Sequence, residues 1–288
     1  MIDLGRCSLT VALGAFSVAA APVPAVAAPA KGPVASIEAI QGTVVRWSVP
    51  GTKTCGMGAR SWEALQETCY YPIDLLHKPG LVKISRKGVG AASFAQISVE
   101  ASSYGSQDIK LGDIPQANPS AADLKRNARD QALVEKIWTK PEGPARFTLP
   151  LGAPASPLPE PQGFGAKWIF NDKPDASEIH SGVDYALGTG TPVLSVADGT
   201  TALAEDLFFT GKAVFVDHGN GLVSMYFHLS EIKVQAGQDV KKGESLGLVG
   251  STGRQTGPHL HMGVRWHDAR IDPQFLLGDP AKIPAIGN

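Results

Sequence analysis

The stretches His180-Ser-Gly-Val-Asp184 and Gly257-Pro-His-Leu-His261 decide the fold and the chemistry expected of this chain. Successive side chains of a β-strand point to opposite faces, so His259 and His261 should emerge on the same side of a strand. The first stretch adds an imidazole and a carboxylate, which are ligand types that zinc accepts. Two histidines, one aspartate and no fourth protein ligand would leave a coordination position for water, as in catalytic zinc sites. The two stretches therefore predict a zinc hydrolase.

Length and composition indicate loop-rich β domains. A chain of 288 residues can form two cores, and its 32 glycines, 22 prolines and 18% charged residues suit β domains better than helical bundles. The net charge of -1 gives no electrostatic reason to expect nucleic acid or an anionic membrane surface as a partner.

Residues 1–27 have the pattern of a signal peptide. Arg6 supplies a positive charge, residues 9–21 form an apolar run, and Ala25-Val-Ala27 offers small residues for cleavage. The run is too short to span a membrane, so no spanning helix is expected after signal removal. An uncleaved anchor or a disordered tail is the alternative. We expect export, with Cys7 lost together with the signal.

Cys55 and Cys69 then remain in the mature protein. Two cysteines in an exported domain predict a disulfide, which in the chain-entropy model would stabilise the fold by roughly 3 kcal/mol. A pair of free thiols is the alternative.

Three structural segments follow the signal. Residues 36–115 contain alternating, β-branched runs separated by turns, which predict a small antiparallel β-sandwich. A connecting helix is expected over residues 118–140, where Ser120 and Asp123 resemble a capping box. Residues 145–280 return to a β pattern and form the predicted peptidase domain. The apolar stripe of the helix would consist of Leu124, Val134, Ile137 and Trp138.

A hairpin is predicted from residue 213 to residue 229. Asn220-Gly221 suits a tight turn with positive φ angles. Regular alternation along the second strand would place His228 on the same face as Ser224 and Tyr226.

The order of these motifs resembles the lysostaphin- and LytM-type zinc metallopeptidases that cut peptidoglycan. The resemblance covers roughly residues 147–277. It rests on the strings Phe164-Gly-Ala-Lys-Trp-Ile-Phe-Asn171, His180-Ser-Gly-Val-Asp184, Gly190-Thr-Pro-Val193, Asp217-His-Gly-Asn-Gly221, Tyr226-Phe-His-Leu229 and Thr252-Gly-Arg-Gln-Thr-Gly-Pro-His-Leu-His261.

The resemblance implies a small antiparallel β fold with one zinc ion in a groove. His180, Asp184 and His261 match the zinc ligands, while His228 and His259 match two histidines that assist the chemistry. The implied function is a zinc-dependent endopeptidase that hydrolyses the peptide cross-links of bacterial peptidoglycan. Zinc-bound water would attack the scissile amide, and the assisting histidines would move the proton or stabilise the oxyanion.

The alternative is a non-catalytic wall-binding protein or an activator of another wall hydrolase. Such relatives have lost metal ligands, whereas this chain has all three and both assisting histidines. Its forepart is similar to that of exported bacterial members, and no wall-binding repeat is evident, which together imply the periplasm. The sequence does not decide whether the protein has a regulatory protein partner.

The serine-hydrolase pattern Gly243-Glu-Ser245-Leu-Gly247 is expected to be accidental. Its serine should lie between a strand and a helix, followed in the chain by an acid and then a histidine. Here the next residues read as a strand, and no histidine follows Asp268.

The remaining polar candidates receive structural roles. His218 is expected to serve hairpin geometry, Asp217 to accept a hydrogen bond in the turn, and His77 and His267 to face solvent. Asn171 could contact the groove, since an asparagine fills the open metal position in some latent relatives, but the sequence does not assign it that role.

Overall fold

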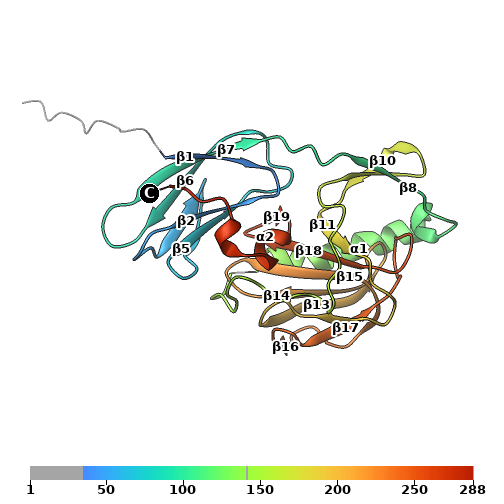
Figure 1. Ribbon diagram of the computed structural model, residues 1–288. Coiled ribbons are helices and arrows are strands. Elements are labelled where there is room, and N and C mark those ends of the chain that lie inside the picture. Colours follow the sequence, from blue (N-terminus) through green and yellow to red (C-terminus); the bar gives the residue numbers. More distant parts are fainter. Residues whose placement is uncertain (1–34, 141, 288) are drawn as a thin grey trace, which may run out of the picture. The chain divides into compact units, whose positions relative to one another are not determined.

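The computed structural model describes residues 35–140 and 142–287, and the fold is mainly β, as predicted (Figure 1). The predicted signal peptide and Cys7 lie outside the described residues. Within the described ranges, no helix has both the length and the apolar character needed to cross a membrane.

The N-terminal part consists of two sheets that share one core. A five-stranded sheet has the order β1-β7-β6-β3-β4, and β2 pairs with β5 in a second sheet. Buried side chains from both sheets, among them Val45, Tyr71, Ile84 and Ile97, form the core between them. The strands are β1 (Ser36–Ile40), β2 (Val44–Ser48), β3 (Thr54–Met57), β4 (Arg60–Glu63), β5 (Thr68–Pro72), β6 (Gly80–Lys87) and β7 (Ser93–Glu100).

The pairing of β1 with β7 is parallel, so the prediction of an entirely antiparallel sandwich was wrong at this edge. Parallel neighbours need a long connection, and β2 to β6 lie between these two strands in the chain. Alternation within a strand does not reveal such a partner.

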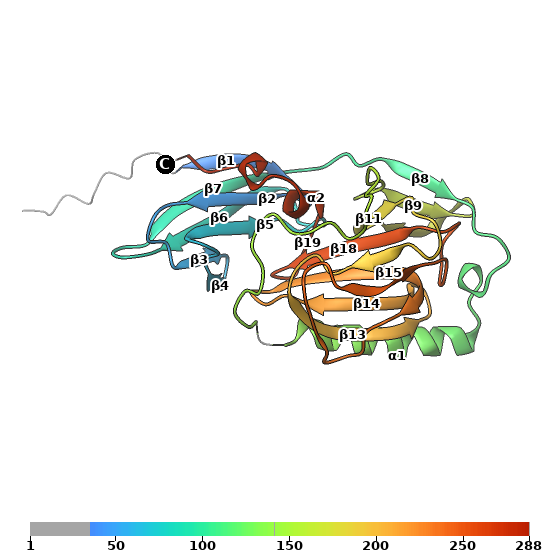
Figure 2. The same ribbon diagram turned by 60° about the horizontal axis from the view of Figure 1, so that its bottom comes forward.

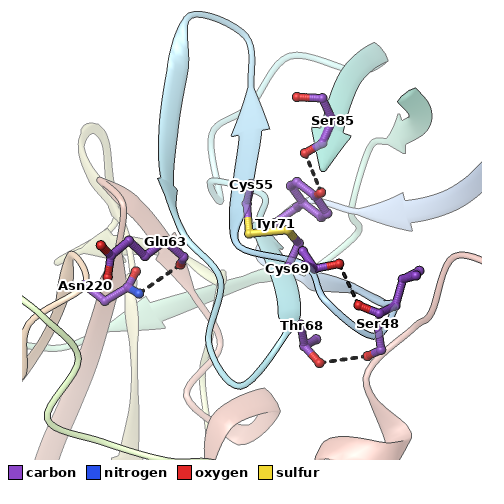
Figure 3. Close-up of a disulfide and its surroundings, with 10 residues drawn as sticks. Ser48, Cys55, Glu63, Thr68, Cys69, Tyr71, Ser85 and Asn220 are labelled. Atoms are coloured by element: carbon purple, nitrogen blue, oxygen red, sulfur yellow. Dashed lines mark hydrogen bonds between the residues drawn. A yellow bond between two sulfur atoms is a disulfide. The ribbon is translucent and has the colours of Figure 1, made fainter. Parts of the chain in front are cut away.

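Cys55 and Cys69 form a disulfide between β3 and β5, which confirms the predicted pairing (Figure 3). The bond therefore links the five-stranded sheet to the two-stranded sheet across their core. Tyr71, beside it, donates a hydrogen bond to the Ser85 carbonyl at 2.8 Å.

The C-terminal part is a nine-stranded antiparallel sheet. Its main order is β11-β18-β15-β14-β13-β16, while β17 pairs with β12 and β15, and β19 pairs with β18. A smaller sheet joins β8 to the β9–β10 hairpin. The strands are β8 (Ser106–Ile109), β9 (Lys167–Phe170), β10 (Lys173–Ile179), β11 (Gly182–Tyr185), β12 (Pro192–Leu194), β13 (Gly199–Leu207), β14 (Gly211–Asp217), β15 (Leu222–Ile232), β16 (Asp239–Val240), β17 (Ser245–Val249), β18 (Leu260–Trp266) and β19 (Ala269–Ile271).

Helix α1 (Ala121–Trp138) lies alongside β13 and β14 (Figure 2). Its capping box is as predicted: the Ser120 side chain accepts from the Asp123 N–H, and the Asp123 side chain accepts from the Ser120 N–H. Ile137, Val134 and Trp138 pack against the sheet, but Leu124 is exposed, so the predicted stripe was wrong at that end. The shorter helices are η1 (Pro115–Ala117), α2 (Gln274–Leu277) and η2 (Pro280–Lys282).

The predicted hairpin is formed by β14 and β15, and Asn220 and Gly221 have positive φ angles of 47° and 66°. Asp217 accepts from the Gly219 N–H at 2.9 Å, which confirms its turn role. His267 was wrongly predicted to face solvent. Its ring is buried against Trp62, with centroids 4.1 Å apart, because a residue from β4 covers this turn.

His218 is a buried structural histidine beside this turn. Its Nδ1–H donates to the Asp198 carbonyl at 2.8 Å, and its Nε2 accepts from the Ser224 hydroxyl at 2.7 Å. Burial lowers the pKa of His218 to about 4, so the ring is neutral at neutral pH.

We expect His218 to make the fold sensitive to mild acid. Between its ordinary pKa of 6.5 and the folded value of about 4, the unfolded chain binds the proton more strongly. Stability should therefore fall as the pH drops through this window, by about 3 kcal/mol in full. Urea unfolding of the wild type and His218→Asn at several pH values measures the difference. An equal pH slope in both proteins would contradict this role.

Candidate metal centre

Three neighbouring strands align the residues of the site. Strands β11 and β18 pair with Asp184 directly opposite His261, and β15 lies on the other side of β18 with Phe227 opposite the same histidine. His180 comes just before β11. The antiparallel register thus joins segments that are far apart in the sequence.

The donor atoms of His180, Asp184 and His261 converge on one point, as predicted. His180 Nε2 lies 3.2 Å from Asp184 Oδ1, and His261 Nδ1 lies 3.0 Å from the same oxygen. The two imidazole nitrogens are 2.8 Å apart. Ligand atoms on one tetrahedral zinc ion are roughly 3.3 Å apart, so this group fits a single ion with little movement.

The group keeps its carboxylate ionised. Burial alone would raise the pKa of Asp184, but the His180 and His261 imidazoles beside the carboxylate outweigh burial and hold this pKa well below its usual range. A metal ligand must be deprotonated, so Asp184 is ready to bind a cation.

Backbone carbonyls orient the histidines. The Nδ1 atoms of His180, His228 and His259 each lie 2.8 Å from a carbonyl oxygen, those of Gly163, Thr252 and Gly257 respectively. Because a carbonyl only accepts, each Nδ1 carries the proton, and a neutral ring then has its lone pair on Nε2. For His180, Nε2 is the nitrogen that faces Asp184 and His261, the other two residues of the metal group.

Two glycines leave room for the ligand rings. A Cβ atom on Gly182 would lie 2.6 Å from His261 Nε2 and 2.6 Å from the Met262 carbonyl oxygen. A Cβ atom on Gly163 would lie 2.9 Å from His180 Nδ1, and its φ of 83° also favours glycine. Steric crowding by His261 and Met262 therefore explains why the motif His180-Ser-Gly-Val-Asp184 has a glycine at position 182.

Aromatic side chains cover the ligand rings. Trp168 stacks on His180 with ring centroids 3.9 Å apart, and Phe227 stacks on His261 at 5.1 Å. Sequence reasoning did not assign either residue to the site. Both lie within the strings that carried the family resemblance, which was the available signal.

A β-bulge places His228 beside the metal group. The pairing of β14 with β15 shifts between Lys212 and Val214, and His228 has a φ of 64°. Phe227 and His228 therefore both lie near His261, with centroids 5.1 and 6.1 Å away. The prediction of regular alternation was wrong here, since a bulge adds one residue to the strand. Such strain in a non-glycine residue is typical of functional sites.

His228 is neutral at physiological pH. Burial, together with the nearby His261 and His259, lowers the pKa of His228 to about 3. Its ring centroid is 4.9 Å from that of His259. The structure thus brings together all five residues that the sequence singled out.

His259 and His261 lie on one side of the chain, as the strand period predicted. His259 Nε2 is 3.7 Å from Asp184 Oδ1. This nitrogen is buried and has no hydrogen-bond partner among the described residues. A buried acceptor without a partner is costly, so the site is built for a ligand that donates to it.

Arg254 connects two chain segments at the edge of the site. Its guanidinium lies over the rings of Phe170 and Phe209, at 4.2 and 4.4 Å, and forms a salt bridge with Glu178. It thereby connects the β9–β10 hairpin to the turn between β13 and β14.

The other sequence candidates lie outside the chemistry. Asn171 accepts a hydrogen bond from the Leu111 N–H at 2.8 Å, which gives its side chain a structural partner. Ser245 begins strand β17, which follows a turn and precedes no helix, so the serine-hydrolase pattern is accidental as expected.

Comparison with known proteins agrees with this geometry. The sequence model of Peptidase family M23 matches residues 178–273, a range that contains all five site residues. A crystal structure assigned to peptidase M23 from Pseudomonas aeruginosa is 31% identical, with a TM-score of 0.63, and the alignment covers 83% of this chain and 95% of that one. The chain belongs to peptidase family M23.

Two curated relatives match this M23 chain over shorter segments. Peptidoglycan DD-endopeptidase ShyA of Vibrio cholerae is 45% identical over 82 residues, 28% of this chain and 19% of that protein. DD-carboxypeptidase/endopeptidase Mpg of Neisseria meningitidis is 44% identical over 95 residues, 33% of this chain and 22% of that protein. The M23 chain therefore matches only about a fifth of the length of these relatives.

Gly182→Ala should weaken metal binding to this M23 chain by roughly 10–100-fold, the usual cost of disturbing a ligand's surroundings. The added methyl group would displace the His261 ring or the β18 backbone. Competition with a chromophoric zinc chelator measures the affinity. Gly188→Ala is the matched control, because a Cβ there meets nothing within 4 Å. Equal affinities of the two variants would contradict the steric argument.

Proposed function

We propose that this protein is a zinc-dependent endopeptidase that hydrolyses the peptide cross-links of bacterial peptidoglycan. The observation that carries the proposal is the convergence of His180, Asp184 and His261, with His228 and His259 beside them. The relatives ShyA, a peptidoglycan DD-endopeptidase, and Mpg, a DD-carboxypeptidase/endopeptidase, support the choice of substrate.

His180, Asp184 and His261 would hold one zinc ion per chain. Two imidazoles and one carboxylate form a nitrogen and oxygen donor set that suits zinc and leaves a position for water. A bound zinc ion lowers the pKa of a coordinated water and polarises the scissile carbonyl.

His228 and His259 would move the proton. Each ring donates from Nδ1 to a backbone carbonyl, so a neutral ring offers the Nε2 lone pair as a base. The low pKa of His228 keeps that lone pair free at neutral pH. One of these nitrogens takes the proton of the attacking water, and the resulting imidazolium returns a proton to the departing amine. The other ring, as an imidazolium, would donate its Nε2–H to the carbonyl oxygen on which charge develops.

The domain plan and the location belong to the same proposal. Residues 36–115 would form a β-sandwich domain, residues 118–140 a connecting helix and residues 145–280 the peptidase domain. Export by the signal peptide would place the enzyme in the periplasm, next to its substrate. The alternative of a non-catalytic activator has less support, because the three metal-binding side chains and both assisting histidines are present and close together.

Digestion of purified sacculi and defined cross-linked muropeptides, followed by mass analysis, tests the activity. We expect cleavage of a peptide cross-link that a chelator abolishes and added zinc restores. A zinc-loaded protein that releases no fragment from any cross-linked muropeptide would refute the enzymatic function.

His228→Ala should keep its zinc but lose roughly 10²–10⁴-fold in kcat, the usual contribution of a positioned acid or base. Metal analysis and muropeptide kinetics on the same sample separate the two effects. His77→Ala is the control, since His77 lies between β5 and β6 of the N-terminal part and hydrogen-bonds the Lys78 carbonyl. Near-normal turnover in the His228 variant would remove this residue from the mechanism.

A further inference from the structure

Helix α1 contributes to a cavity that adjoins the metal group. This cavity, of about 290 Å³, is lined by His180, His228 and His261 and also by Asn127 and Gln131 of α1. The helix precedes residues 178–273, so this part of the cavity lies outside the segment that the family model matches.

The two amides form one polar face of the helix. Asn127 and Gln131 are four residues apart and so project to the same side. Asn127 is half-buried and Gln131 is exposed, and neither side chain hydrogen-bonds another residue of the described ranges. Their donors and acceptors are free for a ligand.

The helix is fixed to the same turn that holds His228. Asp130 accepts a hydrogen bond from the Phe208 N–H at 2.8 Å, and Arg126 donates to the Asp206 carbonyl at 2.8 Å. Two residues further along the turn, the Thr210 carbonyl accepts from the His228 N–H at 3.0 Å. A short chain of contacts therefore sets the distance between the amide face and His228.

A second cavity continues the first along the helix. It has a volume of about 340 Å³ and shares Asn127, Gln131, Phe209 and Thr210 with the cavity of the metal group. The amide face thus lies where the two cavities meet, in a cavity that His180, His228 and His261 also line.

We propose that Asn127 and Gln131 bind the backbone of the substrate peptide as it leaves the metal group and follows α1. This inference rests on the proposed function and adds a substrate-binding wall from the connecting helix. A side-chain amide both donates and accepts, so it can pair with a peptide N–H and C=O together. A rigid helix that carries two such groups fixes one segment of an extended peptide relative to His228.

The test compares Asn127→Ala, Gln131→Ala and the double variant with the wild type, using the full zinc-loaded chain. For the double variant we expect KM for a cross-linked muropeptide to rise roughly five- to fiftyfold, as for two lost hydrogen bonds, with kcat within about threefold. Zinc content should stay unchanged. Alanine favours the helix, so all three variants should fold. Lys125→Ala, exposed on the same helix and lining neither cavity, should behave as the wild type.

Calorimetric titration of zinc-depleted protein with the same muropeptide separates this inference from the enzymatic function. We expect the dissociation constant to rise by the same factor in the double variant and to stay unchanged in Lys125→Ala. If the wild type binds the muropeptide but does not cleave it, the enzymatic function is refuted, whereas the binding role of Asn127 and Gln131 is not contradicted. An unchanged kcat/KM and dissociation constant, a fall in kcat alone, or no muropeptide binding by the wild type would overturn the inference.

Discussion

The register between β11 and β18 is the constraint on which the site depends. It places Asp184 opposite His261, and the pairing of β18 with β15 places Phe227 opposite the same histidine. Cross-strand neighbours lie about 5 Å apart, which allows two ligands to share one ion. A slip of one residue would turn His261 to the other face of the sheet. The buried residues on that face, such as Met262 and Tyr226, therefore protect the metal group by fixing the register.

Around this pairing, neighbouring groups fix the tautomer and the position of the histidine rings. Backbone carbonyls hold three imidazoles in one tautomer, Gly163 and Gly182 leave space for the ligand rings, and Trp168 and Phe227 cover them. None of these contacts needs the metal ion. The protein thus arranges most of the site in advance, so that binding an ion requires little reorganisation.

The short-range features of the fold could be predicted from the sequence. The strand period placed His259 and His261 on one side, Asn220-Gly221 marked the hairpin turn, and Ser120 with Asp123 marked the start of α1. Features that depend on distant partners could not be predicted. The polar turn at His267 gave no sign of Trp62, and the second strand of the hairpin gave no sign of the bulge at His228. The amide face of α1 is likewise polar in sequence. Only the packing of the helix shows that this face lines a cavity beside the metal group.

The most direct measurement is anomalous X-ray scattering at the zinc edge, from crystals of the protein grown with zinc. We expect one ion per chain, bonded to His180 Nε2, Asp184 Oδ1 and His261 Nδ1, with His228 and His259 close by but not coordinated. An empty metal group in the presence of zinc, or an ion held by other residues, would contradict the proposed zinc site.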